Sequence, residues 1–138
     1  MTVDRKTKAV LLVDDDPTIL VLLETAFTKA GYRMVTTLDS EFGLRIANEM
    51  SPSAIILDLM MPKLNGWEFI EALRKDPVTR DTPIVVITAF PGEGLEDRAK
   101  QAGVFSLMVK PLNLTDLINT VALALRSAEV KAAAASHT

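Results

Sequence analysis

Short apolar runs alternate along the chain with longer segments in which apolar residues recur every three or four positions. The short runs are rich in β-branched residues and leucine, which is typical of β-strands. Three of them are apolar almost throughout, as expected for strands buried on both faces of a parallel sheet. The predicted strands are Ala9–Val13, Arg33–Thr37, Ala54–Leu57, Ile84–Thr88 and Ser106–Val109.

The segments between these runs have the periodicity of amphipathic helices. Pro17 stands where a first-turn proline is tolerated, and Asp16 before it is expected to cap that helix. Near the last helix, Asn113 and Asp116 form a variant of the capping box. The predicted helices are 18–30, 40–50, 66–74, 95–102 and one that starts at about residue 113. Five strands and five alternating helices predict an α/β fold, a doubly wound sheet with helices on both faces.

Composition limits the chain to one ordinary domain, because 138 residues, 49% of them apolar, suffice for one core. We expect this domain to occupy residues 1–126, followed by an Ala-rich tail, 127–138, which is helix-favouring over Ala132–Ala135 and lets the last helix overrun. If the chain is complete, no output domain follows, and its output is the binding of a partner.

Charge and residue usage exclude several classes of protein. The net charge is −3 without a long block of like charges, so we expect no binding of nucleic acid by this chain alone. The absence of cysteine excludes disulfides and thiolate metal sites. The apolar run that begins at Ala9 is too short for a signal peptide or a membrane span, so we expect a cytoplasmic protein without membrane contact.

The residues suited to chemistry stand where predicted strands end. Acidic residues follow the first and third strands, a threonine ends the fourth, and a lysine follows the fifth. In doubly wound sheets the carboxyl ends of the strands meet at one crevice, so we expect these side chains to converge. They are Asp14, Asp15, Asp58, Thr88 and Lys110.

This set resembles the receiver domain of two-component response regulators, over about residues 8–126. The stretch after the third strand, which reads DLMMPKLNGWE, is similar to the family's loop after its phosphorylated aspartate. The resemblance implies a flavodoxin-like fold, a five-stranded parallel sheet of order 2-1-3-4-5, of the stand-alone chemotaxis-receiver type. The matching positions are the acidic pair Asp14 and Asp15, the lone Asp58, Thr88 with Ala89, and Lys110 with Pro111.

A metal site follows from this convergence. Three neighbouring carboxylates repel one another strongly, and a hard divalent cation, Mg²⁺ or Mn²⁺, removes the conflict. By resemblance, Asp15 is a direct ligand, Asp14 acts mainly through water, Asp58 supplies an oxygen, and Met60 contributes its backbone carbonyl.

The resemblance also implies the chemistry. Asp58 is the nucleophile that accepts a phosphoryl group from a histidine kinase or phosphotransfer protein. Lys110 neutralises charge on that group, while Thr88, Ala89 and Met60 lie against it. We expect the Lys110–Pro111 bond to be cis. The chain then assists only its own phosphorylation and dephosphorylation and is not otherwise an enzyme.

Signal output is expected at the surface of the fourth helix, fifth strand and fifth helix, which would alter binding of a downstream protein. Receivers usually carry an aromatic switch residue three positions before the lysine, and here that position is Leu107. We therefore hypothesise that, with Thr88, either Phe90 or a shift of the loop at 90–94 carries the signal. Met60 and Phe90 flank the approach of hydrolytic water and predict slow self-dephosphorylation.

Other interpretations stay open. Each of these residues alone has an ordinary structural role, such as helix capping. A pseudo-receiver would use the same fold as a binding module without phosphorylation. A phosphohydrolase of the aspartyl-phosphate type is disfavoured, because Met60 stands where that class has a second aspartate. The chain is alternatively the excised receiver of a larger regulator.

Overall fold

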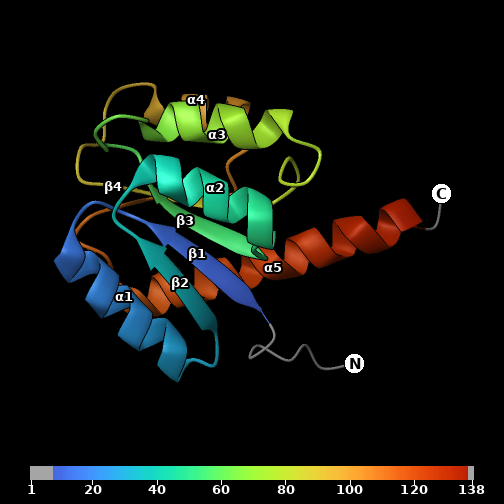
Figure 1. The fold of residues 1–138 in the computed structure, drawn as a ribbon, viewed down its shortest axis with the longest axis horizontal. Coiled ribbons are helices and arrows are strands. Elements are labelled where there is room, and N and C mark those ends of the chain that lie inside the picture. The colour runs from blue at the N-terminus through green and yellow to red at the C-terminus, as the bar shows by residue number, and fades with distance from the viewer. Residues whose placement is uncertain (1–7, 137–138) are drawn as a thin grey trace.

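The computed structural model describes residues 8–136 and alternates strands with helices in the predicted order (Figure 1). Each strand is followed by a helix, the arrangement that parallel pairing requires. The elements are β1 Ala9–Val13, α1 Pro17–Lys29, β2 Arg33–Thr37, α2 Ser40–Met50, β3 Ala54–Asp58, α3 Gly66–Lys75, β4 Ile84–Thr88, α4 Leu95–Gln101, β5 Ser106–Val109 and α5 Leu114–Ser136.

All strand pairs are parallel, and the order in the sheet is β2-β1-β3-β4-β5, which confirms the predicted fold class. Every residue of β1, β3 and β4 is buried, whereas β2 and β5 lie at the edges and are partly exposed. The three runs that are apolar almost throughout are therefore the three inner strands. Within the described residues, no helix is long and apolar enough to cross a membrane.

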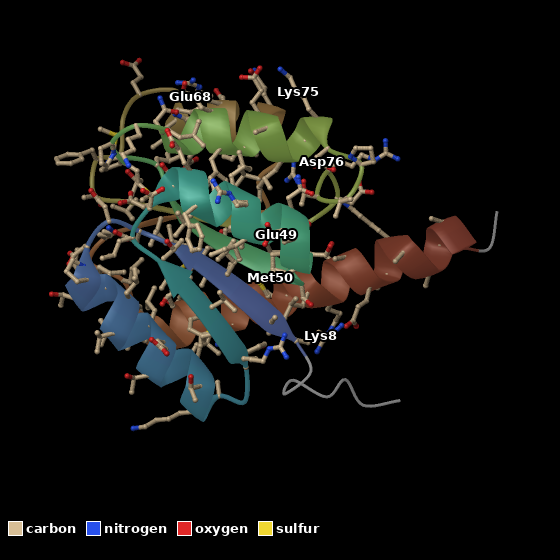
Figure 2. All side chains as sticks on the ribbon, in the orientation of Figure 1. Lys8, Glu49, Met50, Glu68, Lys75 and Asp76 are labelled. Atoms are coloured by element: carbon tan, nitrogen blue, oxygen red, sulfur yellow. The ribbon has the colours of Figure 1, made fainter. Side chains whose placement is uncertain are left out.

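Successive side chains of each inner strand enter two different cores, as the alternation of a β-strand requires. Leu12 packs in the core that α1 and α5 cover, while its neighbour Leu11 packs in the core under α2 and α3. Figure 1 shows α1 and α5 on one face of the sheet and α2, α3 and α4 on the other. Lys8, labelled in Figure 2 where the chain enters β1, pairs through its ammonium with Glu129 on α5 at 3.0 Å.

The helix ends agree with the predicted caps. The Asp16 carboxylate accepts the Thr18 N–H at 2.9 Å, and the Asn113 side chain accepts the Asp116 N–H at 3.0 Å. A full capping box at Asn65 and Glu68, which the sequence analysis did not identify, starts α3. By contrast, α4 starts at Gly94 without a side-chain cap.

Small corrections concern the boundaries. β3 includes Asp58 as its last residue, α3 extends to Lys75, and α4 ends at Gln101. The overrun of the last helix is confirmed, since α5 continues to Ser136 through a segment of strong helix formers. The last two residues of the predicted tail, 137 and 138, lie outside the described part.

Candidate functional site

The predicted crevice lies where the strand order reverses, at the carboxyl ends of β1 and β3. Val13 pairs with Leu57 across these two strands. The next residue on each strand is therefore Asp14 and Asp58, so the parallel register itself places two carboxylates side by side. This is the position at which open α/β sheets bind their ligands.

Asp14 is the most enclosed of these acids, with no exposed surface. One carboxylate oxygen accepts the Asp16 N–H at 2.9 Å, and the other lies 2.9 Å from the ammonium of Lys110. A buried carboxylate is stable only when it is paired and hydrogen-bonded, and Asp14 meets both conditions.

Asp58 is 4% exposed, and one of its oxygens accepts the Met60 N–H at 3.1 Å. Its other oxygen lies 3.6 Å from the Lys110 ammonium. Burial, together with the nearby charge of Asp14, raises the pKa of Asp58 to about 6, although the Met60 N–H and Lys110 act in the opposite direction. Burial is the larger of these causes, so desolvation does most to oppose the ionisation of Asp58.

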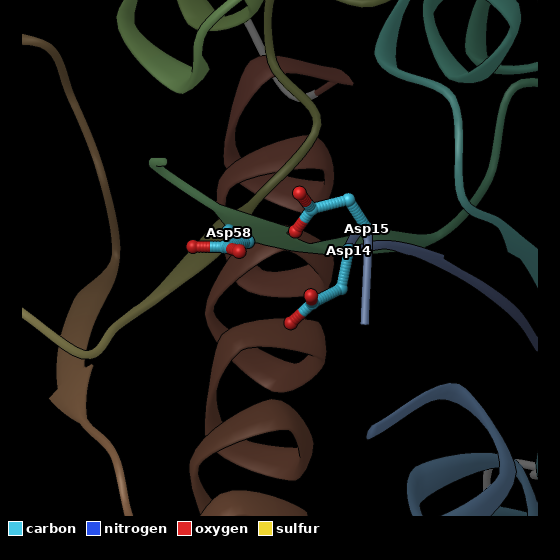
Figure 3. A group of neighbouring side chains, drawn as sticks. All are labelled: Asp14, Asp15 and Asp58. Atoms are coloured by element: carbon cyan, nitrogen blue, oxygen red, sulfur yellow. The ribbon is translucent and has the colours of Figure 1, made fainter. Parts of the chain in front are cut away.

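Asp15 completes a group of three acids whose carboxylate oxygens lie within 4.8 Å of one another. Asp15 is exposed, whereas the other two are buried. Figure 3 shows the side chains of Asp14, Asp15 and Asp58 grouped together at the ends of the strands. Three oxygen donors of this kind fit a hard cation of the Mg²⁺ type.

Lys110 reaches the acids from the end of β5. Burial alone would lower the pKa of Lys110. The hydrogen bond and charge of Asp14, together with the charge of Asp58, outweigh this effect, so the pKa is raised and the ammonium is retained. Its backbone N–H donates to the Thr88 carbonyl at 2.8 Å. The Lys110–Pro111 bond is cis, as predicted. The Lys110 ammonium thus forms ion pairs with two of the three acids, Asp14 and Asp58.

Thr88 ends β4 at the same edge and is 1% exposed. Its hydroxyl oxygen accepts the Phe90 N–H at 3.2 Å, which leaves the hydroxyl hydrogen able to donate. Ala89, the next residue, is exposed. The structure therefore places Thr88 and Ala89, the predicted phosphate-contact residues, at the carboxyl end of β4, the same end of the sheet as the acids.

Two large apolar residues stand two positions after Asp58 and Thr88. Met60 is 59% exposed and Phe90 is 70% exposed, so neither is held by the core. Leu107, at the predicted switch position on β5, is half-buried and packs against the core under α2 and α3. Beside it lies a cavity of about 280 Å³, formed with the loop before α4 and lined by Pro91, Gly92, Gly94, Leu95 and Val109 among others.

The loop that carries Met60 is tied to the start of α2 by contacts that the sequence analysis missed. The hydroxyl of Ser40, 2% exposed, donates to the Pro62 carbonyl at 3.3 Å, and the Lys63 ammonium lies 3.1 Å from Asp39. Lys63 has a φ of 66°, which is unusual for a residue other than glycine. No periodic signal encodes these contacts; Lys and Asp are 24 positions apart in the chain.

Gly66 closes the same loop onto the acceptor strand. A Cβ at this position would lie 2.6 Å from Leu59 Cα and 3.1 Å from the Asp58 carbonyl oxygen. Only glycine permits this approach.

Farther along, the Arg98 guanidinium lies 4.2 Å from the ring centroid of Trp67 and links α4 to α3.

Comparison with known proteins identifies the family. A model of the response regulator receiver domain matches residues 10–122. The "Probable transcriptional regulator ycf27" of Guillardia theta is 36% identical over 99% of this chain, which spans 53% of that protein. The "Probable chemotaxis protein CheY" of Rhizobium etli is 35% identical over 83% of this chain and 88% of its own length.

Solved structures agree with this assignment. The chemotaxis protein CheY4 of Vibrio cholerae superimposes with a TM-score of 0.79 at 30% identity, covering 85% of this chain and 98% of that one. The chain therefore spans about half the length of the ycf27-type regulator and most of the length of the two chemotaxis proteins. Sequence and fold thus point to the same family.

Proposed function

The chain belongs to the response regulator receiver domain family, and on that premise we propose that it is a phosphorylation-controlled switch of a two-component phosphorelay. In this proposal Asp58 accepts a phosphoryl group from a histidine kinase or phosphotransfer protein. The observation that carries it is the placement of Asp58, buried at the switch point of the sheet, beside two further carboxylates and 3.6 Å from an ammonium. Residues 1–126 would form the receiver, and residues 127–138 its tail.

The acid group fits a divalent cation by the chemistry of its donors. Asp15, exposed and close to the other two carboxylates, is our proposed direct ligand, and Asp14 would act mainly through water. Asp58 and the Met60 carbonyl supply the remaining protein oxygens. A bound Mg²⁺ or Mn²⁺ would offset the excess negative charge of the acids and of an incoming phosphoryl group.

The transfer step needs an unprotonated Asp58 oxygen as the nucleophile. This oxygen forms a bond to phosphorus while the bond from phosphorus to the donor's leaving group breaks, and the departing electron pair stays on the leaving group. Lys110, already 2.9 Å from Asp14, would balance charge on the phosphoryl oxygens. The Thr88 hydroxyl and the Ala89 N–H would donate to those oxygens.

The output is proposed to be a change at the surface of α4, β5 and α5. Drawing the Thr88 hydroxyl toward a phosphoryl group would break its hydrogen bond with the Phe90 N–H. The loop from Phe90 to Gly94 would then rearrange, with the cavity beside Leu107 as the space available to it. A downstream protein would distinguish the two arrangements.

Intact-mass measurement after incubation with Mg²⁺ and acetyl phosphate tests the proposal. The wild type should gain one phosphoryl group, and chelation of the metal should prevent the gain. Asp58→Asn should show no gain. The matched control is Asp16→Asn, because this neighbouring acid caps α1 and asparagine caps equally well, so the variant should be phosphorylated normally.

Other outcomes identify the alternatives. If the wild type gains no mass in Mg²⁺ while remaining folded, the chain is a pseudo-receiver that binds its partners without phosphorylation. If free phosphate is released in many turnovers without an adduct, it is a phosphohydrolase. Either result would refute the switch.

A further inference from the structure

A large concave feature lies at the amino ends of β4 and β5, whereas Asp58 lies at the carboxyl end of β3. It is a groove of about 790 Å³ between α5 and the loops that precede β4 and β5. Figure 1 shows the C-terminal part of α5 projecting beyond the ends of the strands, and Figure 2 places Lys75 and Asp76, at the end of α3, on the same side of the molecule. The receiver chemistry proposed above makes no use of this groove.

The floor of the groove is held in place by Arg74 at the end of α3. Its guanidinium is half-buried and donates to the carbonyls of Arg80, Thr82 and Gly103, each at 2.9 Å. These three bonds join the loop before β4 to the turn before β5. The floor is therefore organised before anything binds, which lowers the entropic cost of binding.

The groove is positively charged on a chain whose net charge is −3. Arg74, Arg80 and Lys131 line it, against a single acid, Asp81. Arg80 and Asp81 are 3.9 Å apart and both largely exposed, so their pairing is weak, and Arg80 and Lys131 are the two cations that a ligand can contact. A local reversal of sign of this kind attracts and orients an acidic partner.

The rest of the lining is mainly apolar and consists mostly of small residues, with Thr82 and Ser127 as its polar members. Phe105 contributes an exposed ring, 40% of whose residue surface is accessible. On the α5 side the wall consists mainly of alanines, including Ala128 and Ala132, which let a second backbone approach closely. A small ligand would stay largely in solvent in so open a groove, whereas a peptide segment could lie along the helix and cover it.

We propose that this groove binds an acidic, amphipathic peptide segment of a partner protein, with carboxylates toward Arg80 and Lys131 and an apolar side chain against Phe105. Because the groove lies at the amino ends of the strands and Asp58 at the carboxyl end of β3, this docking leaves the phosphoacceptor site accessible. A partner held here would remain bound whether or not the switch is phosphorylated.

The test is fluorescence anisotropy with the full chain and a labelled synthetic peptide in which Glu alternates with Leu. Its matched analogue carries Gln at every Glu. The acidic peptide should bind, the Gln analogue should bind at least about tenfold more weakly, and added salt should weaken the acidic peptide selectively. Arg80→Glu combined with Lys131→Glu should lower its affinity at least about tenfold.

Controls separate the groove from general charge. Arg33→Glu combined with Arg126→Glu changes the net charge equally at exposed positions outside the groove, and should leave binding unchanged. Ala132→Trp should block the groove sterically and prevent binding of the acidic peptide. The NMR shift changes that this substitution causes should be confined to residues around the groove. Arg74 is not replaced, because its loss would disturb the loops themselves.

Several results would overturn this inference: no binding of the acidic peptide, equal binding by the Gln analogue, or equal losses in the two double variants. Concentration-dependent self-association that Arg80→Glu and Lys131→Glu abolish would show that a second copy of the chain occupies the groove instead. Asp58→Asn should bind the peptide like the wild type, so this experiment stands apart from the test of phosphorylation.

Discussion

The two halves of the receiver site differ in how firmly they are held. At the ends of β1 and β3, Asp14 and Asp58 are buried and hydrogen-bonded to their own backbone. At the end of β4, the chain enters an exposed loop and then α4, which has one buried residue, Ala99, and starts without a side-chain cap. Regions with few buried contacts open at low free energy.

This difference suggests a division of labour. The proposed phosphoryl transfer requires closely positioned groups, and the buried, hydrogen-bonded carboxylates of the β1–β3 half are suited to it. A switch requires a segment with two accessible arrangements, and the loop at 90–94 with α4 is suited to this. Lys110 joins the halves, since it comes from β5 and contacts the acids of β1 and β3.

The largest effect is expected from removing the Lys110 ammonium, which contacts Asp14 and Asp58. Lys110→Ala should slow phosphorylation by acetyl phosphate about 10² to 10³-fold, because a positioned charge is lost at the site of transfer. Lys110→Arg keeps the charge but not the point-like ammonium, and should recover only part of the rate. Mass spectrometry over time gives both rates, and a wild-type rate in Lys110→Ala would show that the two halves act independently.

The lifetime of the phosphoryl group tests the residues on the two sides of the site, Met60 and Phe90. Neither Met60, on the β3 side, nor Phe90, on the β4 side, can orient a water, and a positioned proton acceptor is typically worth ~10² to 10⁴ in rate. We expect slow decay in the wild type with Mg²⁺, and acceleration of about tenfold or more in Met60→Asn and Phe90→Glu. Rapid wild-type decay, or no acceleration in either variant, would exclude control by these side chains.

The rigid half should also leave a signature in the pH dependence of stability. Asp58 has a pKa of about 6 in the folded protein against 3.8 in the unfolded chain. Between these values the folded state holds more protons, so this group's contribution to stability falls as pH rises from about 4 to 6. In metal-free buffer, Asp58→Asn should therefore be more stable than wild type at pH 7, by up to about 3 kcal/mol.

Urea unfolding of both proteins at pH 4 and pH 7 measures this difference. It should nearly vanish at pH 4, where the wild-type carboxyl group is protonated in the folded state. Added Mg²⁺ should stabilise the wild type at pH 7 far more than Asp58→Asn. A constant difference across the pH range would mean that the acids do not conflict.

The smallest effect is expected in the loop at 90–94 and α4, which have few buried residues. A Cβ would meet nothing within 4 Å at either Gly92 or Gly94, but Gly94 has a φ of 78°, so Gly94→Ala should cost about 1 kcal/mol of stability and Gly92→Ala serves as the matched control. With a phosphoryl mimic bound, NMR shifts should appear in the loop at 90–94 and at Ala99–Gln101. If these amides stay unchanged while others shift, the switch lies elsewhere.

Much of the fold and site could be predicted because both depend on local patterns. Continuous apolar runs identified the inner strands, and polar residues at their ends identified Asp14, Asp58 and Lys110, since parallel register converts strand ends into neighbours. Asp16 as a cap followed from the residue type and the proline after it.

The remaining contacts depend on three-dimensional placement that no periodicity encodes. Arg74 reads as an ordinary helix-surface cation, yet it joins two loops through three carbonyls. Lys63 adopts a positive φ and pairs with Asp39, although neither residue type nor spacing indicates this. Such contacts arise only once the elements are packed, which is why the groove beside α5 was not foreseen.

The most direct test of the central claim is to locate the phosphoryl group among three carboxylates that lie within 4.8 Å of one another. Wild-type protein phosphorylated in Mg²⁺ is reduced with borohydride, which converts an aspartyl phosphate to homoserine, and its peptides are sequenced by mass spectrometry. The account predicts conversion at Asp58 alone, with Asp14 and Asp15 intact. Conversion at Asp14 or Asp15, or at none of the three despite a phosphoryl adduct, would contradict it.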